Sequence, residues 1–414
     1  MNLRLSATGL IGVVMIILLL LIGLTYGNFL YTSQNPGGSE FLSLWVGTRL
    51  FLTRGISPYG EQVARQVQEM SLAGDTRPSE GQIWFAYPLY SALIVAPLAL
   101  IADFPLARAI WMSVLEVSLI LIAFNGISLS RWKPPRWLLI IMPIFSLLWY
   151  YGLKPVINGN LAIVVALLIG LAILALKSEL DSLAGFLLAL TTIKPQVVVL
   201  LIPLLLIWTI SHRRWNLFLS FVGSLILLMA GFSLFIPDWI LQNFRQMLSL
   251  SSNTLNSTSQ AILTNWLPGV GKQLGWGITI LMAILLLFEW RSVVGKEFRW
   301  LLWTICLTLV ITNLIGIQTA PENYVAMLLG LVLVFATWDK RWRGVGRWLV
   351  LFCMMILLFG IWLLFLVVLQ SGDQPINDPI LFFVFPVFLL FSLYFIRWWA
   401  ISPPRLFLEQ FLEA

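Results

Sequence analysis

The sequence predicts an all-helical protein that crosses a membrane many times. Of its 414 residues, 60% are hydrophobic and only 10% are charged, which is not typical of soluble domains of this size. The apolar residues fall in blocks of about 20, the length of a helix that spans a bilayer. We therefore expect an all-α polytopic membrane protein with about 10–13 transmembrane segments. These segments form a single integral membrane domain over residues 1–414.

The hydropathy pattern places the spans in order along the chain. The clear spans cover residues 8–30, 105–129, 137–153, 161–176, 216–236, 273–288, 300–317, 324–337, 348–369 and 380–396. The first is a retained span rather than a signal peptide, because it is long and no small-residue cleavage site follows it. Two further apolar stretches are ambiguous: residues 87–102 are short and contain Pro97, and residues 183–210 exceed one span but do not suffice for two.

The distribution of Lys and Arg favours one topology. If residues 87–102 lie on the outer surface and residues 183–210 form a broken helix or hairpin, most basic residues fall on the side of the N-terminus. The break then lies at Lys194-Pro195. If both stretches cross the membrane instead, several basic loops move outside, against the positive-inside rule. We therefore expect both termini in the cytoplasm and a long first external loop over residues 32–86.

This first external loop contains two predicted amphipathic helices that lie along the membrane surface. The first covers residues 40–54, and the second covers residues 61–72. The apolar side chains that the first helix makes available to the membrane are Phe41, Leu44, Trp45 and Phe51.

The composition excludes several kinds of chemistry. The single histidine, His212, lies in a predicted cytoplasmic loop, so an outward-facing Ser-His-Asp triad or histidine-ligated metal site is impossible within this chain. Cys306 and Cys353 both lie in apolar segments, which indicates neither a disulfide framework nor a metal cluster. No Walker-type loop is present. The net charge of +7 is explained by basic loops that orient the protein, so no nucleic-acid partner is expected.

Two ionisable residues stand out from this background. Glu40 begins an otherwise apolar helix directly after the first span; it either performs chemistry or caps the helix and interacts with its dipole. Lys194 lies at the predicted helix break in an apolar stretch, where a charge is costly. It either holds an anionic headgroup or extends its ammonium group to the outer interface.

Several short motifs follow one another in the first half of the chain. They are Glu40-Phe41, Trp45, the turn Gly55-Ile56-Ser57-Pro58-Tyr59, Tyr87-Pro88-Leu89, Asn158-Gly159-Asn160, and a half-helix from Ala184-Gly185 to Lys194-Pro195. In order and placement they resemble the GT-C superfamily of integral membrane glycosyltransferases, most closely the polyprenol-phosphate-mannose-dependent bacterial mannosyltransferases. Glu40 stands where that family usually has Asp, which keeps a carboxylate. The Asn158 loop lacks the family's usual Gln.

The resemblance implies a GT-C-like fold with juxtamembrane helices in the first external loop. It implies transfer of a sugar, a mannose-like hexose, from a polyprenyl-phosphate donor to a lipid or glycan acceptor on the extracytoplasmic face of the plasma membrane. A sugar hydroxyl is a poor nucleophile, so Glu40 is implied as its general base. No metal or other cofactor is implied, because the donor is already an activated phosphodiester. The partners are the donor, the acceptor and the lipid bilayer.

The same resemblance also implies which residues bind the donor phosphate and the substrates. It implies that Lys194, Arg49 and Arg54 bind the donor phosphate. It implies substrate binding by Tyr59, Tyr87, Asn158, Asn160 and Glu322. For Glu322 a purely structural role, a carboxylate at the start of a helix, remains open.

Two other functions are compatible with the sequence. A transporter or flippase of lipid-linked sugars or small polar solutes also has many spans and a broken helix, and a match between the two halves of the chain would favour it. A structural or assembly subunit without activity predicts that Glu40 and Lys194 point into lipid headgroups.

Overall fold

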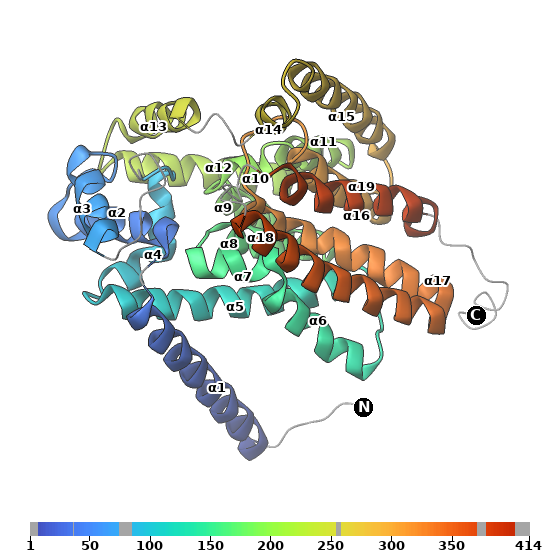
Figure 1. Ribbon diagram of the computed structural model, residues 1–414, viewed down its shortest axis with the longest axis horizontal. Helices are drawn as coiled ribbons and strands as arrows, with labels where there is room; N and C mark the ends of the chain where they lie inside the picture. The colour runs from blue at the N-terminus through green and yellow to red at the C-terminus, as the bar shows by residue number, and fades with distance from the viewer. Residues whose placement is uncertain (1–6, 36, 74–84, 254–257, 371–377, 402–414) are drawn as a thin grey trace. The chain divides into compact units, whose positions relative to one another are not determined.

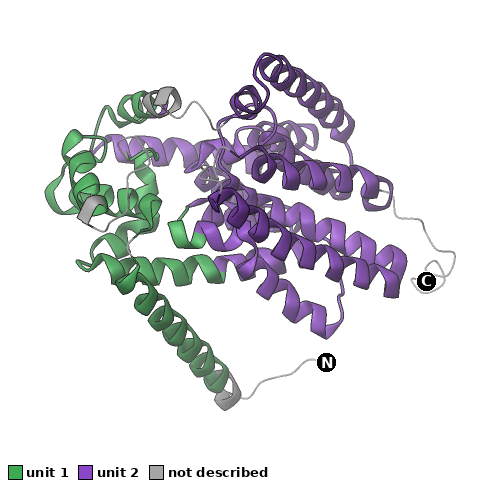
Figure 2. Cartoon of the chain, in the orientation of Figure 1, with its two compact units in different colours: residues 1–117, 156–160, 236–246 green, residues 118–155, 161–235, 247–414 purple. Residues whose placement is uncertain are grey.

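The computed structural model describes residues 7–35, 37–73, 85–253, 258–370 and 378–401. Within these ranges the regular structure is helical throughout, with no β-strand. The chain forms two compact units, which have different colours in Figure 2. Unit 1 comprises residues 1–117, 156–160 and 236–246, and unit 2 comprises residues 118–155, 161–235 and 247–414.

Unit 1 contains the helices that follow the N-terminus. These are α1 (Ala7–Gln34), α2 (Ser39–Arg54), α3 (Glu61–Ala73), η1 (Leu89–Ser91), α4 (Ala92–Ala99), the first part of α5 (Phe104–Leu129), the end of α7 (Tyr150–Asn158) and the start of α13 (Trp239–Asn253). Figure 1 shows α2 beside α3 and α4.

Unit 2 contains the rest of α5, α7 and α13 together with the remaining helices. These are α6 (Arg136–Leu148), α8 (Ala162–Lys177), α9 (Asp181–Thr191), α10 (Pro195–Val198), α11 (Leu201–Ser211), α12 (Trp215–Ser233), α14 (Ser259–Trp266), α15 (Gly271–Val293), α16 (Phe298–Thr312), η2 (Pro321–Met327), α17 (Leu328–Met355), η3 (Ile356–Gly360), α18 (Ile361–Gln370) and α19 (Pro379–Ile401).

Six helical stretches of the described chain are long and apolar enough to cross a bilayer. They are Ile11–Gln34, Phe104–Leu129, Trp215–Ser233, Gly271–Val293, Pro321–Gln370 and Pro379–Ile401. The bent pair α6 and α7, with an angle of 50° between its halves, adds a seventh if it counts as one span. The expected class, an all-α polytopic membrane protein, is confirmed.

The number of long spans is smaller than the number of apolar segments for two reasons. The helices α8 and α16 have only 16 and 15 residues, which is short of the roughly 20 that cross a bilayer unaided. The expected spans 324–337 and 348–369 also lie in one helical stretch, Pro321–Gln370, which is kinked at Arg343. Arg343 has φ = 47°, which is outside helical geometry.

The apolar stretch 183–210 is divided into three helical pieces. The helix α9 ends at Thr191, α10 begins at Pro195, and α11 begins at Leu201. Proline fits the first helical position because its missing N–H would have no partner there. Lys194 is the residue that directly precedes α10.

A glycine lets two helices of unit 2 approach closely. At Gly185 of α9, an added Cβ would lie 2.5 Å from the carbonyl oxygen of Leu217 and 2.7 Å from the amide nitrogen of Phe221, both on α12. An ion pair between Asp181 and Arg214 joins the start of α9 to the residue before α12. The helices α9 and α12 are therefore tied by an ion pair at one end and approach each other closely at Gly185.

The helix α2 differs from the expected surface helix. Phe41, Leu44 and Trp45 are buried in unit 1, so the expectation that they face the membrane is wrong. Trp45 donates a hydrogen bond to the carbonyl oxygen of Leu98 at the end of α4, with 3.0 Å between the atoms. The apolar face of α2 packs against protein, because α4 and the start of α5 cover it.

Polar contacts join α1 to α5 within unit 1. Asn28 donates to the hydroxyl of Ser113 at 3.0 Å and to the carboxylate of Glu116 at 2.9 Å. The apolar side chains of α1 from Ile11 to Ile22 are exposed, as expected for a surface in contact with lipid. Hydrogen bonds between side chains define how α1 packs on α5, because apolar surface alone does not distinguish protein from lipid.

We expect Gly185→Ala to destabilise the protein, because the neighbouring backbone atoms of α12 cannot move away without separating the helices. Overpacking of this kind costs about 1–3 kcal/mol. The measurement is the thermal midpoint of the purified protein in detergent. Gly223→Ala on α12 is the control: its Cβ meets no atom within 4 Å, so its midpoint should stay unchanged or rise. Equal midpoints for the two variants would contradict the close contact.

Candidate active site

Glu40 lies in the first turn of α2, close to a turn made by two glycines. The turn residue Gly38 precedes the helix with φ = 74°, a left-handed conformation that favours glycine. The Glu40 side chain is half-buried, so it is reachable from outside the protein. Its position near the helix N-terminus also favours a negative charge there.

Both oxygens of the Glu40 carboxylate accept hydrogen bonds from side chains of unit 1. The Nδ2 atom of Asn160 donates to Oε1 at 2.7 Å, and the hydroxyl of Tyr87 donates to Oε2 at 2.8 Å. Asn160 is fully buried and Tyr87 is 8% exposed, so the two donors are fixed while the carboxylate stays accessible. The structure thus brings together three residues that the sequence predicted separately.

Tyr87 is held in place by Tyr59. The Tyr59 hydroxyl donates to the carbonyl oxygen of Tyr87 at 2.7 Å, and the Phe85 ring packs edge-on against both tyrosines. Burial raises the pKa of Tyr59, so its hydroxyl stays protonated and acts as a donor over the physiological range. In this geometry Tyr59, a predicted substrate-binding residue, contacts the backbone that carries Tyr87.

Asn160 is placed by the glycine before it. Gly159 has φ = 72°, and a Cβ there would lie 2.4 Å from the Cβ of Phe41. The indole nitrogen of Trp111 donates to the Gly159 carbonyl oxygen at 2.9 Å, and the Trp111 ring stacks on Phe41 with 5.5 Å between centroids. Only a glycine therefore allows the loop to approach α2 so closely.

The first part of α13 adds amide side chains that the sequence analysis did not identify. Gln246 donates from Nε2 to the carbonyl oxygen of Tyr59 at 2.8 Å, and Gln242 accepts from the Ser57 hydroxyl at 2.6 Å. Asn243 is also buried. The signal was present in the sequence: amides at positions 242, 243 and 246 recur on one helix face, while Leu241 and Phe244 on the other face are exposed.

The other predicted residues of unit 1 have different surroundings. The Nη1 atom of Arg49 donates to the carbonyl oxygens of Ala99 and Ile101 at 2.8 and 3.2 Å, which satisfies the end of α4. Arg54 is exposed in the last turn of α2. Asn158 is half-buried at the end of α7.

Lys194 and Glu322 belong to unit 2. Lys194 is only 5% exposed, beside the start of α10. Glu322 is half-buried in the first turn of η2. Their roles remain predictions from the sequence. Asp75, an acidic residue of the predicted first external loop, lies outside the described residues.

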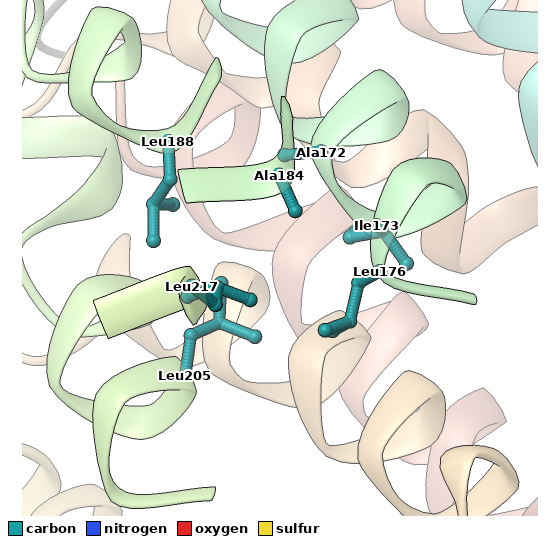
Figure 3. A pocket seen from close by; sticks show the side chains of 7 residues that line it. All are labelled: Ala172, Ile173, Leu176, Ala184, Leu188, Leu205 and Leu217. Atoms are coloured by element: carbon teal, nitrogen blue, oxygen red, sulfur yellow. The ribbon is translucent and has the colours of Figure 1, made fainter. Parts of the chain in front are cut away.

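The described residues include no metal-binding cluster, and the pocket that some of them form in unit 2 is apolar. No group of three His, Cys, Asp or Glu side chains in the described ranges lies close enough to hold a metal ion. Figure 3 shows a small pocket in unit 2 with a purely aliphatic lining. Its walls are Ala172, Ile173, Leu176, Ala184, Leu188, Leu205 and Leu217. The pocket therefore offers no catalytic group.

Comparison with known families defines the class of protein. The sequence profile described as Glycosyltransferase family 87 matches residues 85–315, which is more than half of the chain. The protein is therefore a membrane glycosyltransferase, with a sugar donor and an acceptor as its substrates. It belongs to glycosyltransferase family 87. No curated protein and no solved structure matches the chain. The matched region contains Tyr87 and Asn160, and Glu40 precedes it.

We expect Gly159→Ala to disturb the site. The substitution strains a left-handed residue by about 1–2 kcal/mol. It also drives the new Cβ against that of Phe41, which cannot rotate away. The thermal midpoint should fall, and Asn160 should move from Glu40.

The control is Gly55→Ala, also in unit 1. Gly55 has φ = 66° but no atom within 4 Å of an added Cβ, so this variant carries the backbone strain without the collision. Gly159→Ala should be the less stable of the two in the same thermal assay. Equal losses would show that the collision has no effect.

Proposed function

We propose that the protein transfers a mannose-like hexose from a polyprenyl-phosphate donor to a lipid or glycan acceptor. The reaction takes place on the extracytoplasmic face of the plasma membrane, with Glu40 as the general base. Membership of glycosyltransferase family 87 supports the type of reaction. The order of the motifs from Glu40 to Lys194 supports the donor class, by resemblance to the polyprenol-phosphate-mannose-dependent branch of the GT-C superfamily.

The arrangement around the Glu40 carboxylate is the observation that carries this proposal. A general base must keep a fixed position and an accessible lone pair. Asn160 and Tyr87 each use one lone pair of a different oxygen, and every carboxylate oxygen has two. Glu40 itself is half-buried rather than enclosed, so an acceptor hydroxyl can approach the carboxylate from outside the protein.

The chemistry needs such a base at the acceptor. As the acceptor oxygen attacks the anomeric carbon, its proton passes to Glu40, the bond from the anomeric carbon to the phosphate oxygen breaks, and polyprenyl phosphate leaves. Asn160 and Tyr87 hold the carboxylate in one orientation during this transfer. Such preorganisation avoids reorienting the base in the transition state.

The extracytoplasmic location follows from the distribution of basic residues. The loops rich in Lys and Arg indicate the cytoplasmic side, and the segment with Glu40 follows the first span on the opposite side. Both termini are cytoplasmic in this topology, and the active site faces the cell envelope.

We assign Lys194 separately, within unit 2, as a ligand of the donor phosphate. Lys194 is only 5% exposed and lies at the interruption between α9 and α10. An ammonium carries three donors, and a hydrogen bond to a phosphate oxygen is strengthened by both charges. Arg49, Arg54, Asn158 and Glu322 remain further candidates for contacts with the substrates.

We expect Glu40→Gln to abolish most turnover. The amide keeps the size of the side chain but cannot accept the proton, and general bases contribute about 100- to 10,000-fold. The measurement is transfer of labelled mannose from a polyprenyl-phosphate donor by purified protein, with an envelope lipid extract as the acceptor. Glu40→Asp should retain measurable activity, because it keeps a carboxylate with a shorter reach.

Glu69→Gln is the matched control. Glu69 is an exposed carboxylate on α3 in the same unit, so its loss should leave transfer unchanged. Near-normal transfer by Glu40→Gln would refute its role as base. If wild-type protein moves the labelled lipid across vesicles but never consumes it, the transporter reading replaces the transferase.

We expect Lys194→Met to weaken donor binding by about 10- to 100-fold, the range for a hydrogen bond to a charged group. Lys194→Arg should retain part of the affinity. The measurement is equilibrium binding of a labelled polyprenyl-phosphate sugar to purified protein. Lys272→Met, at an exposed lysine of unit 2, should bind as the wild type does. Unchanged affinity in Lys194→Met would identify Lys194 as a structural lysine.

A further inference from the structure

Arg108 is a buried cation in an apolar helix of unit 1. It lies in the first part of α5 and is only 2% exposed. Within the described ranges, no carboxylate lies at ion-pair distance from it. A charge buried in an apolar helix costs free energy unless neighbouring groups stabilise it. Arg108 therefore needs strong interactions with other parts of the protein.

The guanidinium group of Arg108 joins two segments of the backbone. Its Nη1 atom donates to the carbonyl oxygen of Asn35 at 2.8 Å, and its Nη2 atom donates to that of Ile157 at 3.0 Å. Asn35 directly follows α1, and Ile157 lies in the last turn of α7. Carbonyl groups at helix C-termini lack partners and carry partial negative charge. Two helix ends therefore take the place of a carboxylate.

Each of these helix ends leads directly into the site around Glu40. From Asn35 the chain passes through Gly37 and Gly38 to Glu40, and from Ile157 it passes through Gly159 to Asn160. The Nδ2 atom of Asn160 lies 2.7 Å from the Glu40 carboxylate. One planar side chain thus fixes the approach of both partners in this hydrogen bond.

The glycine turn is shaped to receive this arginine. An added Cβ at Gly38 would lie 2.6 Å from the Nε atom of Arg108, and one at Gly37 would lie 3.3 Å from Nη2. Trp111, one turn further along α5, contacts the second segment through the carbonyl oxygen of Gly159. The same face of α5 therefore holds both segments.

We propose that Arg108 is a positioning residue that sets the distance between Glu40 and Asn160 by clamping the ends of α1 and α7. The clamp itself depends only on the hydrogen bonds of unit 1. Its consequence for turnover rests on the function proposed above. Arginine suits this role because its planar fork binds two acceptors at once, whereas lysine presents a compact point charge.

The first experiment measures the clamp without any substrate. Hydrogen–deuterium exchange of the full-length protein in detergent is compared between wild type and Arg108→Lys. We expect exchange to become about 10-fold faster in peptides covering residues 37–43 and 156–161, because local opening follows the loss of contacts that hold a segment.

Asn28→Ala is the matched control for this experiment. It removes the hydrogen bonds of α1 to Ser113 and Glu116 on α5 but none of the contacts of Arg108. Exchange in residues 37–43 and 156–161 should stay as in the wild type. Unchanged exchange in Arg108→Lys, or an equal increase in Asn28→Ala, would overturn the clamp.

The second experiment separates positioning from a general loss of structure. In Arg108→Lys we expect kcat to fall about 10- to 100-fold with KM nearly unchanged, because small misplacements of a catalytic group cost about that much. Arg108→Met should lose more, so the lysine variant counts as a partial rescue. Asn28→Ala should keep the wild-type kcat.

A double-variant cycle gives the deciding result. With Asn160→Ala already present, Arg108→Lys should reduce kcat much less than it does alone, because the hydrogen bond that it positions is gone. Equal effects in both backgrounds would make Arg108 merely structural and overturn the proposal. If wild-type protein transfers no sugar, the function proposed above fails, and the exchange measurement still decides whether the clamp exists.

Discussion

The Glu40 carboxylate depends on two hydrogen bonds that unite distant parts of the chain. Tyr87 lies 47 residues from Glu40 in sequence, and Asn160 lies 120 residues away. The hydrogen bond of Tyr59 to the Tyr87 backbone and that of Trp111 to Gly159 keep these donors in place. Unit 1 is thus a scaffold for one half-buried carboxylate, in keeping with the role of general base that we propose for Glu40.

A membrane environment explains why so many of these contacts are polar pairs. Hydrocarbon offers no partner to a hydrogen-bonding group, so polar side chains in apolar helices need partners within the protein. Asn28 finds Ser113 and Glu116, and Arg108 finds the carbonyl groups at two helix ends. Such contacts also fix the rotation of a helix, which apolar packing alone leaves open. The hydrogen bonds that satisfy Arg108 thus also join the two segments that lead to Glu40 and Asn160.

The sequence identified the residues of the site better than the contacts between them. Glu40 and Tyr87 were identified by their order along the chain, but nothing local shows that one donates to the other. Arg49 and Arg54 were predicted alike, yet Arg49 binds the end of α4 and Arg54 is exposed. Arg108 was missed, although a cation inside an apolar span is itself a signal of a buried contact.

The sequence by itself determined the class of protein, the order of the helices and the break before Pro195, because these depend on local composition and on the backbone limits of proline. It did not determine which apolar faces meet lipid and which meet protein. Phe41 and Trp45 were expected at the membrane and are buried, since both environments select the same apolar side chains. Only the tertiary structure decided that choice and the partners of Glu40, because both depend on contacts between segments far apart in sequence.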